Sequence, residues 1–581
     1  MDQHEKFWGK PLASRKISDA VSMGPSEAPT EQETRKRIKH GGCCTAAHGL
    51  FMEYCNNSTV HGMQYLGERR RSIVERIFWI VVFFVSIYFC GILIWNIYVK
   101  WDTSPVIVSF SEKSTPVWQI PFPAVTICPE TKAKQTVFNF TDIYHRIHGN
   151  ETLTDDEKFK LEIIAQTCDA HLLVNAGIGN ATITSDCIDQ LLDMAPQFNE
   201  TLFHCKYQNL ADTCDTLFAP IITEDGVCYT FNALSGQEIY RKEAMADDFM
   251  YYEPIKESNK SWTLEKGYTA ESSTNFSVYP FRVLAAGARA GLFVLLSLYD
   301  NELDYLCRGP VQGFKVLLHT PGEQPRVSKH YFRVPTLQEV IVTVKPQMIQ
   351  TSDNLLNYSP ERRQCYFNHE RQLKYFQIYT QSNCELECLA NHTLSECGCV
   401  KFSMPRDKET PICGAAQIEC YNKAEDDILK KEINEGLLTS TDAARGNTQC
   451  NCLPACTSIQ YDVETSQARF NWEDLFKAYK NPLDEFPSIQ FARLSIFFKE
   501  AQFITSKRSE LYGPTDFLAN CGGLMGLFMG ISLLSFVEIF YFCSVRLCCN
   551  LKMRMDNKKR ANSVRKPGIL VEKPTEKEYV E

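Results

Sequence analysis

The chain has 581 residues, of which 44% are hydrophobic and 23% are charged, and its net charge is −9. These averages resemble those of an ordinary soluble protein, but the apolar residues are concentrated in two segments. The acidic balance argues against nucleic acid as a partner of the region between these segments.

The first predicted element is a polar tail, residues 1–76, which ends in a cluster of arginines up to Arg76. No residue is charged from Ile77 to Val99. A membrane-spanning helix needs about 20 mostly apolar residues. Residues 77–99 are therefore predicted to form the first transmembrane helix.

A long loop follows, residues 100–516, and its patterns predict a mixed α and β domain. The elements expected within it are strands at 339–344 and 494–498, a helix with a tight turn at Cys384–Cys399, and a charged surface helix and loop at 423–444. The apolar run 281–299 contains Arg282 and Arg289, which argues against a third membrane span.

The second predicted span, residues 517–545, contains the most informative segment, Gly522–Phe540. This segment carries four glycines, a Gly-Ile-Ser triplet and Glu538. Glycine weakens a helix by roughly 1 kcal/mol relative to alanine, and a carboxylate at membrane depth costs roughly 2.5–3.5 kcal/mol. A helix that only anchors a protein in the membrane needs neither the glycines nor the carboxylate. The segment is therefore predicted to pack against other helices and to form part of an ion path.

The basic residues indicate the topology. Lysines and arginines gather before the first span and again in the C-terminal tail, residues 546–581. The positive-inside rule then places both tails in the cytosol and the loop outside the cell. The acidic loop would attract cations, although secreted surfaces are also often acidic for solubility. Residues 1–40 and 552–581 lack apolar periodicity and are predicted to be disordered.

The loop is rich in cysteine, with 17 of the 25 cysteines of the chain. Oxidised pairs are expected outside the cell, although the spacings in CELEC, CGC and CNCLPAC are also found in zinc sites. Because the number is odd, at least one thiol is expected to be free or to pair between chains.

Eight N-glycosylation sequons also fall in the loop, in agreement with an extracellular location. They begin at Asn139, Asn150, Asn180, Asn199, Asn259, Asn275, Asn357 and Asn391. Two more, at Asn56 and Asn57, lie in the predicted cytosolic tail and are expected to stay unmodified.

The sequence lacks several motifs of common enzymes. His369-Glu370 begins like a zinc-protease helix, but Leu373 stands where the second histidine is required. The sequence has no GxxxxGK[ST] loop and no GxSxG elbow. The chain is therefore not expected to be an enzyme or to need a metal or other cofactor.

Taken together, several motifs resemble the degenerin/epithelial sodium channel family, and most closely its insect pickpocket branch. They are STVHG at 58–62, FPAVTICP at 122–129, GVCYTFN at 226–232, the three cysteine motifs, and GGLMGLFMGIS at 522–532. They occur in the family's order, from about residue 40 to 545.

The resemblance implies an acid-sensing-channel-like trimer, homomeric or heteromeric, in which the second span of each subunit lines the pore. Gly530, Ile531 and Ser532 match the family's selectivity filter, whose carbonyl and hydroxyl oxygens bind a dehydrating Na⁺. Alternatively, Gly522, Gly526 and Gly530 only pack helices through their GxxxG spacing. Both roles are compatible, and Gly522 and Gly526 are then pore residues.

Other matching positions imply roles in conduction and gating. Glu538 matches an acidic position of the family, where it would attract cations below the filter; the alternative is an interfacial glutamate that reaches towards water. His61 and Gly62 match a cytosolic His-Gly pair that forms a re-entrant gating structure. Ala519 matches the small residue of the degenerin gating position.

The family's disulfide pattern implies seven bridges. These are Cys128–Cys228, Cys205–Cys214, Cys365–Cys456, Cys384–Cys452, Cys388–Cys450, Cys397–Cys420 and Cys399–Cys413. For the remaining cysteines, a Cys168–Cys187 bridge and a free Cys307 are predicted.

The predicted function is a sodium-selective, voltage-insensitive, amiloride-sensitive channel subunit in the plasma membrane, opened by a ligand, pH, osmotic change or force. It is expected to serve a sensory or epithelial role, with the lipid bilayer and related subunits as partners. One alternative is a two-span scavenger-type receptor, which needs no filter; another is a non-conducting auxiliary subunit. On an unbroken helix the glycines and Glu538 cannot all face one axis, so the helix is predicted to break at residues 530–532 in the conducting trimer.

Overall fold

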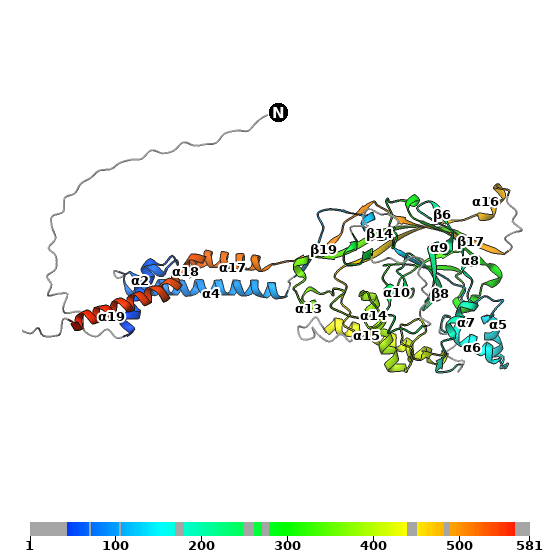
Figure 1. Ribbon diagram of the computed structural model, residues 1–581, viewed down its shortest axis with the longest axis horizontal. Helices are drawn as coiled ribbons and strands as arrows, with labels where there is room; N and C mark the ends of the chain where they lie inside the picture. The colour runs from blue at the N-terminus through cyan, green and yellow to red at the C-terminus, as the bar shows by residue number, and fades with distance from the viewer. Residues whose placement is uncertain are drawn as a thin grey trace, which may run out of the picture. The chain divides into compact units, whose positions relative to one another are not determined.

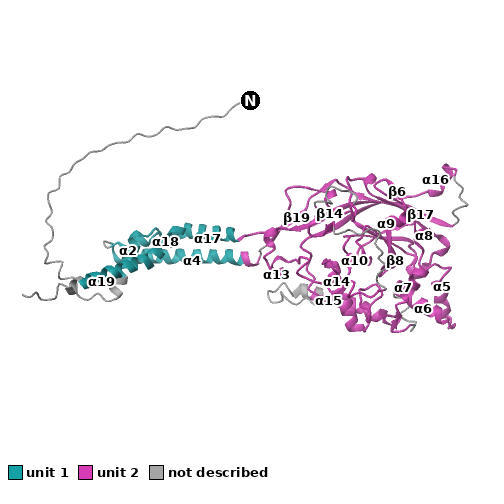
Figure 2. Ribbon diagram, in the orientation of Figure 1, with its two compact units in different colours: residues 1–100, 514–581 teal, residues 101–513 magenta. Residues whose placement is uncertain are grey.

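The computed structural model of the chain (Figure 1) describes residues 43–68, 71–103, 106–168, 179–247, 261–269, 278–438, 450–480 and 488–563. The chain divides into two compact units (Figure 2). One unit combines Met1–Lys100 with Pro514–Glu581, and the other is Trp101–Gly513. The predicted disordered residues 1–40 lie outside the described residues.

The described part of the first unit is mostly helical. Its elements are α2 (Cys43–Asn57), α3 (Met63–Gly67), α4 (Ile73–Thr103), α17 (Pro514–Met529), α18 (Leu533–Tyr541), a π-helical turn (Phe542–Arg546) and α19 (Leu547–Ser563). Ile73–Thr103 and Leu533–Asn557 are long and apolar enough to cross a membrane, and few of their residues are buried within the chain. Their exposed apolar surface therefore needs lipid or other protein to cover it.

The prediction that residues 552–581 are disordered is wrong for their first part, because α19 continues to Ser563. Leucine, lysine, methionine and arginine are good helix formers, and neither glycine nor proline interrupts this stretch. An apolar stripe is thus not required for a helix that extends an existing one. The structure does not describe residues 564–581.

The second unit is built on an eight-stranded sheet with the order β1-β19-β14-β17-β11-β5-β6, in which β16 also pairs with β14. The bounds are β1 Val106–Phe110, β19 Ser506–Glu510, β14 Gln338–Thr351, β17 Ile489–Phe498, β11 Leu292–Tyr299, β5 Leu202–Tyr207, β6 Leu210–Asp212 and β16 Ser458–Arg469. Both predicted strands are confirmed, within β14 and β17. The apolar run at 281–299 ends in β11, whose neighbours are strands of this sheet.

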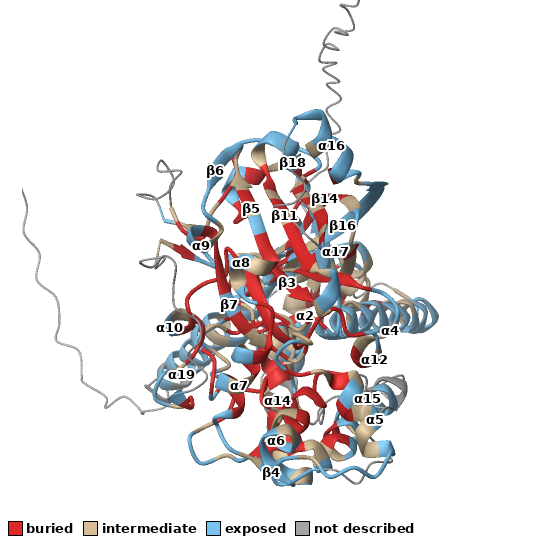
Figure 3. Cartoon of the chain, turned by 90° about the vertical axis from the view of Figure 1, so that its right-hand side faces the viewer, coloured by how far each residue is buried: buried red, intermediate tan, exposed pale blue. Residues whose placement is uncertain are grey.

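A five-stranded sheet lies in the same unit, with the order β13-β12-β3-β8-β7. Its bounds are β13 Phe332–Pro335, β12 Gly313–His319, β3 Ala124–Pro129, β8 Gly226–Phe231 and β7 Phe218–Thr223. The shorter strands are β2 Thr115–Pro116, β4 Thr182–Ile183, β9 Trp262–Thr263, β10 Gly267–Tyr268, β15 Ile412–Cys413 and β18 Gln502–Phe503. Buried residues gather along the strands of the two larger sheets, and exposed residues lie mainly at the periphery (Figure 3).

The second unit also contains helices. The longer ones are α5 Phe140–His148, α6 Asp155–Ile164, α7 Cys187–Met194, α14 Gln381–Cys397, α15 Ile418–Leu438 and α16 Trp472–Ala478. The short ones are α8 Phe198–Thr201, α9 Cys214–Leu217, α10 Gly236–Ile239, α12 Tyr305–Arg308 and α13 Pro360–Arg363. The predicted helix at Cys384 and the predicted surface helix after residue 423 are confirmed as α14 and α15, whereas residues 439–449 are not described.

Eight disulfides cross-link the second unit. Seven of them join the cysteines that the family resemblance implies: Cys128–Cys228, Cys205–Cys214, Cys365–Cys456, Cys384–Cys452, Cys388–Cys450, Cys397–Cys420 and Cys399–Cys413. The cysteines of the CELEC, CGC and CNCLPAC motifs thus bind one another or Cys365, Cys413 and Cys420, which leaves no thiolates in these motifs for zinc.

The eighth disulfide corrects the sequence prediction. Cys168, after the end of α6, pairs with Cys307 of α12 rather than with Cys187, and Cys307 is therefore not a free thiol. Cys187 is buried at the start of α7 and forms none of these disulfides. The fold places Cys307 of α12 beside Cys168, although 139 residues of sequence separate them. The sequence prediction was wrong because it paired Cys168 with Cys187, which is closer along the chain.

Serine substitutions distinguish the two pairings. Cys307→Ser should release the Cys168 thiol and lower stability by about 2–5 kcal/mol, since native disulfides constrain the unfolded chain. Cys187→Ser is the matched control and should keep all eight bridges. Alkylation of the denatured, unreduced protein should gain one label in Cys307→Ser and lose one in Cys187→Ser. If Cys307→Ser instead lost one label and Cys187→Ser gained one, the result would support the Cys168–Cys187 pairing.

The predicted glycosylation sites differ in exposure. Asn150, Asn180, Asn199, Asn357 and Asn391 are exposed. Asn139 is half-buried and caps α5, where its side chain accepts a hydrogen bond from the backbone N–H of Asp142. Asn259 and Asn275 lie outside the described residues.

Candidate functional site

The second apolar segment is broken where α17 ends and α18 begins. Gly530 has φ 66°, in the left-handed region that glycine adopts without steric penalty. Its N–H donates to the Gly526 carbonyl at 2.9 Å, and the Ile531 N–H donates to the Met525 carbonyl at 3.3 Å. Such a left-handed residue is a common helix C-terminus.

Ser532 starts the next helix. It is the N-cap of α18, and its hydroxyl accepts a hydrogen bond from the Ser535 N–H at 3.4 Å. The Ser535 hydroxyl in turn accepts from the Ser532 N–H at 3.1 Å. The local sequence therefore encodes a helix stop and a helix start within three residues. The interruption predicted for the conducting trimer is already present in the single chain.

The segment between α2 and α3, Ser58–Gly62, lies against this break. The Ser58 hydroxyl accepts from the Val60 N–H at 3.2 Å, which shapes a local turn. The His61 N–H donates to the Met529 carbonyl at 2.9 Å, a carbonyl at the open end of α17. Gly62 then takes φ 88° as the N-cap of α3 and turns the chain.

The imidazole of His61 fills the space beside Gly530. A Cβ atom added to Gly530 would overlap the His61 ring, with Nδ1 as the nearest atom. The absence of a side chain at Gly530 thus serves two purposes, the left-handed backbone and the close approach of His61.

Farther along α18, Glu538 contacts the same segment. Its Oε2 accepts from the Thr59 N–H at 3.2 Å and from the Thr59 hydroxyl at 3.0 Å. The Thr59 hydroxyl also lies 2.8 Å from the hydroxyl of Ser535, which is fully buried. Glu538 therefore anchors the segment in the single chain, a role that neither sequence interpretation of this residue included.

Further contacts hold the segment from both sides. After α18, Arg546 donates to Glu53 of α2, with Nε at 2.9 Å from Oε1. The rings of Tyr54 and Phe542 meet edge to face at 5.4 Å. On the α3 side, Tyr65 stacks on Trp79 of α4 at 4.3 Å. The segment is thus tied to both apolar segments of the unit.

The structure brings some of the predicted site residues together and leaves others apart. The segment that carries His61 contacts Gly530, at the start of the Gly530-Ile531-Ser532 break, and Glu538. Gly62 directly follows His61, and its own nearest side chain is that of Trp79 in α4. Ala519, Gly522 and Gly526 lie along α17 and are exposed, and a Cβ atom added to Gly522 would meet nothing within 4 Å.

Sequence reasoning assigned no role to Thr59, although it lies in the STVHG motif, and did not single out Ser535. Ser535 had a local signal, because Ser-x-x-Ser is a helix-capping pattern. Thr59 had none, since its partner Glu538 is 479 residues away. Contacts across that separation follow only from the fold.

Comparison with known proteins agrees with this architecture. The family model described as amiloride-sensitive sodium channel matches residues 54–542. Pickpocket protein 28 of Drosophila melanogaster is 32% identical over 530 residues, which cover 87% of this chain and 80% of that protein.

More distant relatives cover similar shares of the chain. Sodium channel protein Nach of Drosophila melanogaster is 24% identical over 87% of this chain and 89% of its own length. Acid-sensing ion channel 1 of Gallus gallus is 23% identical over 87% of this chain and 86% of its own length.

Proposed function

This chain belongs to the amiloride-sensitive sodium channel family, a family of ion channels, and we propose that it forms a sodium-selective, voltage-insensitive, amiloride-sensitive channel opened by an extracellular stimulus. The observation that carries this proposal is the helix break at Gly530-Ile531-Ser532, with His61 packed against it. A membrane anchor has no use for an interrupted helix. A pore uses the small residues and freed backbone groups of such a break.

The proposed channel is a trimer in the plasma membrane, with both termini in the cytosol. Exposed apolar residues on α4 and exposed glycines on α17 support it, since the single chain covers neither. Small residues allow the backbones of neighbouring helices to approach closely. Three copies of α17 would then narrow the pore at Gly522 and Gly526, with Ala519 at the gate.

The triplet at residues 530–532 is the proposed selectivity filter. Three copies would offer backbone carbonyl and Ser532 hydroxyl oxygens to an ion that sheds its water. His61 and Gly62 are proposed to control gating from the cytosolic side, because His61 packs against Gly530 of this triplet and Gly62 turns the chain directly after it.

Whole-cell recording from cells that express the chain alone, during exposure to acid, candidate ligands, osmotic change and force, tests the function. We expect an inward current that disappears when Na⁺ is replaced by N-methyl-D-glucamine and that amiloride blocks. Surface expression with current only beside a conducting relative would instead indicate an auxiliary subunit. Surface expression without current in either setting would favour the receptor alternative.

Glu538→Gln separates the charge of this residue from its anchoring contact. The amide oxygen can still accept hydrogen bonds from Thr59, so the segment should stay attached. If the carboxylates attract cations in the pore, single-channel conductance should fall roughly two- to threefold. Unaltered conductance and selectivity would count against a pore role.

The matched variant is Thr59→Val, which preserves shape and removes the hydroxyl. A hydrogen bond to a charged group contributes about 1.5–3 kcal/mol. If this contact exists in only one gating state, the open-to-closed ratio should change about tenfold or more, while conductance stays that of the wild type.

A further inference from the structure

A cavity of about 890 Å³ lies within the second unit. Residues of β12, β13, β14, β16, β19 and the start of α14 line it. Val316, Leu318, Phe332 and Ile349 give it apolar walls. Its volume is that of sites that hold small organic ligands.

Arg508 of β19 brings an uncompensated charge to this cavity. The residue is only 9% exposed, and its Nη1 atom has no hydrogen-bond partner. Within the described part of the chain, no carboxylate pairs with it. Burial lowers the pKa of this guanidinium. Arg363 adds a second positive charge nearby, and Glu370 pairs with Arg363 rather than with Arg508.

The carboxylates that line the cavity do not supply the missing charge. Glu385 pairs with Lys329, and Asp462 accepts a hydrogen bond from Gln347. Burial raises the pKa of Glu323 to about 7, so a large share of this residue is neutral at neutral pH. The cavity therefore combines an apolar wall with a buried cation that lacks an anion.

We propose that this cavity binds a small organic carboxylate with an apolar body, whose carboxylate pairs with Arg508. The planar guanidinium presents two parallel donors that match the two oxygens of a carboxylate. The body of the ligand lies against Leu318, Phe332 and Ile349. Under the proposed topology the site opens outside the cell, and none of its lining residues belongs to the proposed pore.

Binding is measured on the purified full chain in detergent micelles. The probe is N-acetylphenylalanine, and its amide is the neutral control with the same body. The acid should bind and raise the unfolding temperature, and the amide should bind at least about tenfold more weakly, since a charge-assisted pair is lost. Equal binding of acid and amide would overturn the proposal.

Variants of Arg508 locate the site. Arg508→Gln should weaken binding of the acid at least about tenfold. Arg508→Lys should have an affinity between those of the wild type and Arg508→Gln, because lysine keeps the positive charge but lacks the two parallel donors of the guanidinium. Arg469→Gln, an exposed arginine at the end of β16, is the control and should bind like the wild type. Unchanged affinity in both Arg508 variants would refute the assignment.

Stability without ligand gives an independent readout. A buried, unpaired charge is unfavourable, so Arg508→Gln should unfold at a higher temperature than the wild type when no ligand is present. A purely structural arginine would give the opposite shift and would contradict the proposal. Chloride is tested against methanesulfonate as the reference anion. If chloride alone raised the unfolding temperature as much as the organic acid does, the proposal would also be contradicted, because a simple anion would then satisfy Arg508.

Discussion

Replacing Gly530 with alanine is expected to abolish most of the current without removing the protein from the cell surface. An L-residue in the left-handed conformation costs roughly 1–2 kcal/mol, and the new methyl group would overlap the His61 ring. The two effects together should displace the segment that carries His61 from the end of α17. We expect at least a tenfold loss of current per surface channel, measured by recording and surface biotinylation.

A double mutant tests whether the overlap is the cause. His61→Ala makes room for the methyl group, so Gly530→Ala should be less harmful in a His61→Ala background than in the wild type. Gly523→Ala is the matched control, since an added Cβ at Gly523 meets nothing within 4 Å and the backbone there is helical. Equal losses of current in the two backgrounds would contradict the steric explanation.

The sequence was sufficient for features that depend on local chemistry. Apolar runs with at most one charged residue predicted the two apolar helical segments, and β-rich alternation predicted strands within β14 and β17. The helix break could also be predicted, because Gly530 is a residue type that commonly ends a helix and Ser532 is one that commonly begins the next. In each case the residues that determine the structure are neighbours in the chain.

The errors arose where distant residues meet. The pairing of Cys168 with Cys307 depends on the approach of α6 and α12, which no spacing reveals. The contact of Thr59 with Glu538 likewise depends on how the segment folds back against α18. A helix beyond residue 552 was missed for another reason, since polar residues can extend a helix that begins earlier in the chain.

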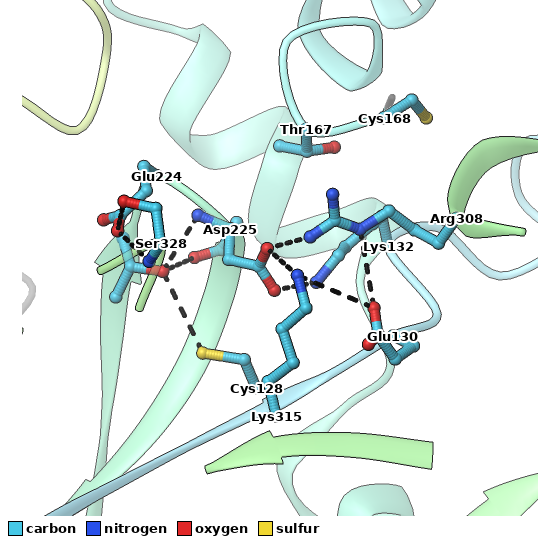
Figure 4. Close-up of polar contacts among 12 residues, drawn as sticks. Cys128, Glu130, Lys132, Thr167, Cys168, Glu224, Asp225, Arg308, Lys315 and Ser328 are labelled. Atoms are coloured by element: carbon cyan, nitrogen blue, oxygen red, sulfur yellow. Dashed lines mark hydrogen bonds and ion pairs between the residues drawn. The ribbon is translucent and has the colours of Figure 1, made fainter. Parts of the chain in front are cut away.

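A buried charge cluster in the second unit illustrates the same dependence on tertiary structure. Lys132, Lys315 and Arg308 converge on the carboxylate of Asp225 in the turn between β7 and β8 (Figure 4). Lys132 Nζ lies 2.6 Å from Oδ2, and Lys315 Nζ lies 3.0 Å from Oδ1. Glu130 contributes a second buried carboxylate, 3.5 Å from Arg308. Burial, with Arg308 nearby, lowers the pKa of Lys132.

Asp225→Asn is therefore expected to destabilise this unit strongly. The side chain keeps its shape, but three buried cations lose their nearest anion. Breaking a buried ion pair from one side costs about 3–5 kcal/mol, enough to consume much of the stability of a typical domain. Thermal unfolding of the purified chain should shift down by many degrees, and surface expression should fall.

Replacing a cation of this cluster instead of the aspartate gives the comparison that tests this prediction. Lys132→Met removes one of several cations around Asp225 and Glu130 and replaces it with an apolar chain of similar length, so both carboxylates keep other partners. Its loss of stability should be clearly smaller than that of Asp225→Asn. If cations and carboxylates were balanced in this cluster, the two variants would be equally harmful. A larger effect of Lys132→Met would show that the lysine, not the aspartate, is the group around which the cluster is built.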